Sequence, residues 1–172
     1  MSWYAIFVET GFEEEVCLNI DALHKSGQCE VKYSLLVPKR VIYERKQGIR
    51  KTVVKKMFPG YVLLKTDNIY EFYMQARGIP HIINFLKSSY YFLEVSKNEI
   101  TQIASMTDNK GLIKISQALM VNDKICITDG PLYGREGIIK KIDKRKGRAK
   151  VEFSINENVL LIDLGIDIIK KD

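Results

Sequence analysis

The first 105 residues of the chain alternate between segments with strand spacing and segments with helical spacing. Aromatic and β-branched side chains at positions 3–9 predict a strand. Thr10, with a glutamate three positions later, predicts a capping box that starts a helix. Apolar residues then recur every three or four positions from Phe12 to Leu23, which predicts one buried helical stripe, and Gly27 ends the helix. On this pattern the three glutamates at 13–15 face solvent beside the positive end of the helix dipole.

More strands and helices follow in the same alternation. Positions 31–37 and 61–64 have the aromatic and β-branched content of strands, and the second of these follows a Pro-Gly turn. Asn68 and Ser96 are each followed three positions later by a glutamate, so a capping box should start a helix directly after each of them. This alternation predicts an α+β fold, an antiparallel sheet with helices packed on it.

A long basic hairpin is expected between the second strand and the Pro-Gly turn. Strand segments at 41–44 and 53–56 flank a polar turn, and too few apolar residues are present to bury both faces. Positions 39–56 hold eight basic residues, and Glu44 is the one acidic residue among them. The hairpin is a candidate for contact with DNA, and a solvated edge hairpin is an equally good interpretation.

A break in periodicity divides the chain into two predicted domains. Polar residues at 107–111 interrupt the pattern, and no clear helical or strand period follows until about position 120. We therefore expect an N-terminal α/β sandwich at 1–106, a linker at 107–119 and a smaller domain at 120–172.

The C-terminal segment has the pattern of a small β-barrel. Short apolar strands are expected at 125–128 and 137–142, with a glycine-rich turn between them and a basic turn at 144–148. Glycines interrupt the β-branched stretches, so a helix would fit this segment poorly. The charge is concentrated here, because positions 133–150 hold eight basic and two acidic residues, a surplus of six that equals the net charge of the chain.

This density of lysine and arginine is typical of a surface that binds nucleic acid. Such side chains neutralise phosphates and release counterions, and a basic turn can enter a groove that a flat sheet cannot. A solvated lysine-rich loop is the alternative. The candidate RNA-binding residues are Arg135, Lys140, Lys141, Lys144, Arg145, Lys146, Arg148 and Lys150.

Composition and motifs exclude several classes of protein. The content of 46% apolar and 28% charged residues is ordinary for a globular protein, and no apolar run approaches the roughly 18 residues of a membrane span. The chain opens on a strand pattern without a basic signal peptide, so we expect a cytoplasmic protein without membrane contact. The three cysteines lack C-x-x-C spacing, and no catalytic or metal-binding pattern is present. We expect a monomer with no enzyme activity, metal or cofactor.

Several short motifs occur in one order along nearly the whole chain. They are Trp3-Tyr4, Phe58-Pro59-Gly60-Tyr61-Val62, Arg77-Gly78-Ile79-Pro80, Asn122-Asp123 with Ile125, and Asp129-Gly130-Pro131 with Gly137. Together they resemble the NusG family of transcription elongation factors, in which an NGN domain is joined to a KOW domain. The resemblance implies an NGN sandwich at 1–106 and a KOW β-barrel at 120–172.

The resemblance also implies two partners. In the family, an apolar pocket of the NGN domain grips the clamp helices of RNA polymerase, and the KOW domain recruits a second partner. The residues that match the pocket are Phe7, Phe58, Tyr61 and Phe85. Aromatic side chains suit this role because they supply a large contact area at low conformational-entropy cost. A place in the domain core is the alternative for these rings.

Departures from the family pattern point to RNA as the second partner. Housekeeping members carry aromatic residues on two KOW loops, where this chain has Arg135 and Asn156, and acidic residues where it has Lys140 and Lys141. The chain therefore looks like a specialised paralogue of the LoaP kind, a processive antitermination factor whose KOW domain reads an RNA hairpin. A ribosome-associated or general RNA-binding KOW protein is the alternative.

Overall fold

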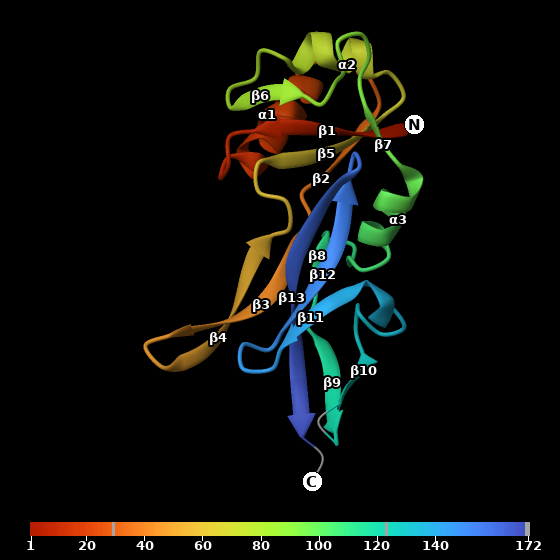
Figure 1. Cartoon of the computed structure of the whole chain (residues 1–172). Helices are drawn as coiled ribbons and strands as arrows, with labels where there is room; N and C mark the ends of the chain where they lie inside the picture. Colours follow the sequence, from red (N-terminus) through yellow and green to blue (C-terminus); the bar gives the residue numbers. More distant parts are fainter. Residues whose placement is uncertain (29, 123, 171–172) are drawn as a thin grey trace. The chain divides into compact units, whose positions relative to one another are not determined.

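The computed structural model describes residues 1–28, 30–122 and 124–170 (Figure 1). The chain forms two compact units. Unit 1 holds Met1–Val37 and Phe58–Ile100, and unit 2 holds Pro38–Met57 together with the described residues from Thr101 onward. The domain boundaries expected from the sequence stay a prediction, and the compact units divide the chain differently.

Unit 1 is a sheet with helices packed on it (Figure 1). Its strands pair in the order β2-β5-β1-β6, with β7 also paired to β1, and every pairing is antiparallel. The elements are β1 (Ser2–Val8), α1 (Glu13–Lys25), β2 (Tyr33–Leu36), β5 (Tyr61–Thr66), α2 (Ile69–Ala76), β6 (Ile82–Phe85) and β7 (Glu94–Val95). The core joins Ile6 and Leu64 of the sheet to Val16, Ile20 and Phe72 of the helices. The predicted α+β architecture is confirmed.

The start of α1 differs from the prediction. Glu13 does not face solvent; it is fully buried, and its carboxylate accepts hydrogen bonds from the backbone amides of Gly11 at 2.9 Å and Gly60 at 2.8 Å. The amide of Gly60 belongs to the Pro-Gly turn before β5. Glu13 therefore ties that turn to the start of the helix, because a carboxylate compensates two backbone donors at once.

The capping boxes predicted at Asn68 and Ser96 start helices, but the one predicted at Thr10 and Glu13 was wrong, because α1 begins after Phe12 and has no side-chain capping hydrogen bond. The side chain of Asn68 accepts a hydrogen bond from the Glu71 amide at 3.2 Å at the start of α2. At α3 (Lys97–Ala104), the Ser96 hydroxyl accepts from the Glu99 amide at 3.3 Å, and the Glu99 carboxylate accepts from the Ser96 amide at 2.9 Å. The boundary between the two units falls within α3.

Unit 2 contains two sheets. The larger has the order β10-β9-β13-β12-β11 and the smaller the order β4-β3-β8. The elements are β3 (Lys39–Lys46), β4 (Ile49–Lys56), β8 (Leu112–Ile113), β9 (Ser116–Val121), β10 (Lys124–Asp129), the 3-10 turn η1 (Glu136–Ile138), β11 (Ile139–Asp143), β12 (Arg148–Ile155) and β13 (Asn158–Lys170). Every second residue of β12 is buried, including Val151 and Phe153, and these pack in the core with Leu164 and Ile166 of β13. Strands rather than helices build the C-terminal segment, as predicted.

Two strand assignments of the sequence analysis were wrong. The segment 107–119, where no strand was predicted, contains β8 and most of β9. The inward side chains of β9 are Ser116 and Ala118, so the buried face carries no large apolar residues and the alternation is hidden. Ser116 is tolerated in the core because its hydroxyl accepts a hydrogen bond from the Leu132 amide at 3.0 Å. The strand expected at 137–142 begins only at Ile139, after η1.

The predicted basic hairpin is present as β3 and β4. A two-residue turn, Gln47-Gly48, joins the strands, and both residues have positive φ angles of 52° and 78°. This is the geometry of a turn that matches the right-handed twist of a hairpin. The hairpin belongs to unit 2, where β3 also pairs in parallel with β8.

Candidate nucleic-acid interface

The basic turn at 144–148 connects β11 to β12 and is shaped by an aspartate. The carboxylate of Asp143 accepts a hydrogen bond from the Lys146 amide at 2.9 Å, and the Lys146 ammonium lies 3.9 Å from the same carboxylate. The amide hydrogen bond, with the neighbouring cations, holds the pKa of Asp143 below its ordinary value. Asp143 therefore stays ionised at neutral pH and folds the turn back, so that the basic side chains project from it.

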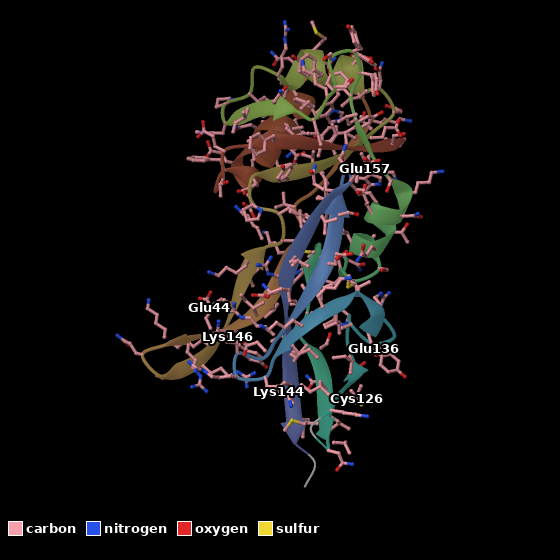
Figure 2. The ribbon with its side chains drawn as sticks, viewed as in Figure 1. Glu44, Cys126, Glu136, Lys144, Lys146 and Glu157 are labelled. Carbon is pink, nitrogen blue, oxygen red and sulfur yellow. The ribbon has the colours of Figure 1, made fainter. Side chains whose placement is uncertain are left out.

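The eight predicted RNA-binding residues fall into two groups. Lys141, Lys144, Arg145 and Lys146 are exposed on the turn or directly before it, and Figure 2 labels two of them. The other four, like Lys146, contact acceptors on the protein. Lys140 pairs with Glu152 at 3.2 Å, and Arg148 and Lys150 pair with Asp163 at 3.5 and 3.4 Å. The Arg135 guanidinium donates to the carbonyl of Pro131 at 3.1 Å and to two more carbonyls.

The structure brings the basic hairpin to the same unit as the basic turn. The Arg148 guanidinium donates a hydrogen bond to the carbonyl of Tyr43 on β3 at 2.9 Å, and Arg50 on β4 lies 3.5 Å from the carboxylate of Asp167 on β13. Gly165 allows the backbone of β13 to approach the backbone of β3, because a Cβ at this position would lie 2.6 Å from the carbonyl oxygen of Val41. Sequence reasoning assigned the two basic segments to different halves of the chain, and no local signal in the sequence reveals their contact.

The four predicted polymerase-binding aromatics do not form one exposed patch. Phe7 on β1 and Tyr61 on β5 are register partners with ring centroids 5.4 Å apart, and Phe7 is 39% exposed. Phe58 and Phe85 are only 3% and 1% exposed. The ring of Phe85 contacts three core rings, those of Phe72, Tyr73 and Phe92. The role of all four residues stays a prediction, and the rings at the surface are those of Phe7 and Tyr61.

Within residues 1–28, 30–122 and 124–170, no group of three or more His, Cys, Asp or Glu side chains could hold a metal ion. None of the helices in those residues is long and apolar enough to cross a membrane.

The architecture is that of an NGN domain joined to a KOW domain. The chain is similar in fold to a solved structure described as domain interaction in Thermotoga maritima NusG, with a TM-score of 0.54, 21% identity, and coverage of 95% of this chain and 93% of that one. This match agrees with the fold class expected from the sequence.

Sequence comparison gives the family. Residues 1–104 match the family model for NusG, described as transcription termination factor nusG. The chain belongs to the NusG family, whose members are transcription factors and not enzymes, and RNA polymerase binding is general for the family. The transcription termination/antitermination protein NusG of Rickettsia prowazekii is 27% identical over 171 residues, covering 98% of this chain and 89% of the relative. The protein of the same description from Thermus thermophilus is 27% identical over 165 residues, covering 90% of each.

Proposed function

We propose that this chain is a processive antitermination factor of the LoaP type, which binds RNA polymerase and an RNA hairpin in the nascent transcript. The NGN part supplies the polymerase contact and the basic turn supplies the RNA contact. Family membership supports the first of these and the charge of unit 2 supports the second.

One observation carries the RNA half of the proposal, namely the exposed cations of a turn with a defined shape. Lys144, Arg145 and Lys146 project from a tight turn that the Asp143 carboxylate organises. A narrow turn of this kind suits the groove of an A-form helix, where phosphates line both edges. Preorganised cations bind phosphates with a smaller loss of conformational entropy than cations on an unstructured loop.

The polymerase half rests on the Phe7–Tyr61 ring pair of unit 1. Two adjacent aromatic rings at the surface of a rigid sheet are suitable anchors for an apolar partner, here the clamp helices of RNA polymerase. In this proposal Phe85 acts from the core by holding β6 against β1. Phe58 is likewise buried, so its contribution is to the shape of the pocket rather than to its exposed area.

RNA binding is tested with a variant of the basic turn. Lys144, Arg145 and Lys146 are replaced together by Ala in the full chain. RNA crosslinked to the unaltered chain in growing cells identifies a structured hairpin, and binding of both chains to that hairpin is then measured across salt concentrations. If all three contact phosphates, the slope of log affinity against log salt should flatten by about 3 units. An unaltered slope, or equal affinity for a hairpin, a single strand and duplex DNA, would remove RNA as the specific partner.

A transcription assay tests the link between the two halves. Purified RNA polymerase should read through a terminator in the presence of the chain when the template encodes the recovered hairpin. The basic-turn variant should still bind polymerase but lose this effect. Readthrough that does not depend on the RNA element would contradict the antitermination part of the proposal.

A further inference from the structure

A cleft lined by cations from both basic segments lies between the β3–β4 hairpin and the basic turn. Its volume is about 330 Å³, large enough for a nucleotide-sized group. The lining residues are Tyr43, Glu44, Arg45 and Arg50 of the hairpin and Arg145, Lys146 and Arg148 of the turn. All seven belong to unit 2, and Figure 2 labels one residue from each segment, Glu44 of the hairpin and Lys146 of the turn. Five cations and one carboxylate line the cleft, and three of the cations, Arg50, Lys146 and Arg148, also lie near Asp167, Asp143 and Asp163.

The two walls of the cleft are fixed to each other. The guanidinium carbon of Arg50 lies 3.5 Å from the centre of the Tyr43 ring, and the same guanidinium lies 3.5 Å from Asp167. From the other side, Arg148 donates to the Tyr43 carbonyl at 2.9 Å and lies 3.5 Å from Asp163. Cation–π and charge-assisted contacts of this kind hold the hairpin in place before any ligand arrives.

Two exposed arginines of the cleft lack an ion-pair partner among the described residues, although the Asp143 carboxylate acts on Arg145 as a nearby charge. Among the described residues, neither Arg45 nor Arg145 forms an ion pair with a carboxylate, and both side chains are exposed. Glu44, the acidic residue of the lining, instead pairs with Lys55 at 3.0 Å. An anion entering the cleft would therefore meet at least two guanidinium groups without displacing an ion-pair partner.

Strand register explains why the charges converge. Arg45 lies directly opposite Arg50 in the antiparallel pair, and side chains two positions apart share a face, so Tyr43 is on that face as well. Like charges directly opposite each other destabilise a strand pair. An anion bound between them removes this repulsion. Glu44 on the other face also reaches the cleft, whereas Lys46, the residue next to Arg45, is not among the residues that line it.

We infer that the cleft binds a phosphate of the RNA backbone, so that the β3–β4 hairpin forms the second half of the RNA-binding surface. The inference rests on the proposed function of the basic turn. Guanidinium groups suit phosphodiester oxygens because their donors pair with two oxygens at once. The Tyr43 ring has Arg50 over it, which leaves that face unavailable for stacking on a base. The cleft therefore reads the backbone rather than the sequence of the RNA.

The test compares two adjacent basic residues of the hairpin, Arg45 and Lys46. Arg45→Ala and Lys46→Ala each remove one exposed cation, the first from the lining of the cleft and the second from a neighbouring position outside that lining. Binding of the full chain to a fluorescently labelled RNA stem-loop is measured by anisotropy across salt concentrations. We expect Arg45→Ala to weaken binding about tenfold at about 0.1 M salt and to lower the salt slope by about one, as for one lost phosphate contact. Lys46→Ala should bind as the unaltered chain does.

The outcomes separate this inference from the proposed function. Equal affinities for Arg45→Ala and Lys46→Ala overturn the cleft as a phosphate site, even if the basic-turn variant has lost RNA binding. If the basic-turn variant also binds RNA normally, both proposals fail. A labelled DNA duplex is the second probe, and dependence on Arg45 for DNA but not for RNA overturns the assignment to RNA. Thermal unfolding of each variant verifies that the chain remains folded.

Discussion

A single added methyl group tests the packing of β13 against the basic hairpin. A Cβ at Gly165 would lie 2.6 Å from the carbonyl oxygen of Val41 and 2.9 Å from Cγ1 of Ile115. The carbonyl oxygen is part of β3 and cannot rotate away, so Gly165→Ala forces one of the two strands to shift. We expect a loss of about 1–3 kcal/mol in the free energy of unfolding, the usual cost of overpacking.

The assay is thermal unfolding beside a matched glycine variant. For a chain of this size each kcal/mol corresponds to about 2–4 °C, so Gly165→Ala should lower Tm by roughly 2–12 °C. Gly137→Ala is the control, because no atom lies within 4 Å of the added Cβ and its φ is not in the left-handed region. Equal Tm values for the two variants would refute the close approach of β3 and β13. Gly165→Ala should also weaken RNA binding without any change in charge, since it displaces one wall of the cleft.

Three further results are expected. Glu13→Ala should lower the free energy of unfolding by about 1–3 kcal/mol, because it leaves the buried Gly60 amide unpaired. Glu15→Ala, at an exposed site, should change the free energy of unfolding by less than about 0.5 kcal/mol, and urea unfolding compares the two variants. Phe85→Ala should cost about 3–5 kcal/mol of stability as a core truncation, while Phe7→Ala should leave Tm near its original value and weaken polymerase binding by about 2 kcal/mol. Because the pKa of Asp143 is lowered on folding, its stabilisation is present above the ordinary value of 3.8 and is lost as pH falls below it. The Lys146 amide that it binds should therefore lose its protection from hydrogen exchange in acid, measured by NMR relative to the intrinsic exchange rate at each pH.

Local patterns predicted the elements whose causes are local. The helix after Asn68 and the helix after Ser96 begin where the sequence placed them, because a capping side chain and the amide it binds are three positions apart. The basic hairpin was predicted for the same reason, since its turn and its strand register depend on adjacent residues. In each case the determining contacts lie within one short segment of chain.

The features that the sequence did not predict depend on contacts between distant residues. Glu13 is buried by its hydrogen bond to Gly60, 47 positions away, and nothing in a run of three glutamates distinguishes it from its neighbours. Strand β9 was missed because Ser116 replaces an apolar residue on its inward face. The contact between Arg148 and Tyr43 spans 105 positions, so the shared cleft could not be predicted from either basic segment alone.

Aromatic residue type did not separate core from surface in unit 1. Phe7 and Phe85 both matched the family pocket, but one is 39% exposed and the other 1%. They lie on neighbouring strands, β1 and β6, and side chains of adjacent positions in a strand point to opposite faces of the sheet. Only the register of the sheet decides which ring faces the helices.

The discontinuity of unit 2 in the sequence determines the order in which the chain can fold during synthesis. The hairpin at 39–56 leaves the ribosome before the part of unit 1 that follows it, but β13, against which it packs, is synthesised only after β8 to β12. Unit 1 can collapse as soon as residue 100 is available, because all its strands have then been synthesised. The hairpin cannot dock until β13 has been synthesised, and closing the long loop between the hairpin and β13 slows this docking step. A nascent chain that stops short of β13 therefore exposes eight cations on an undocked hairpin, and a fragment that begins at residue 120 lacks one wall of the cleft altogether.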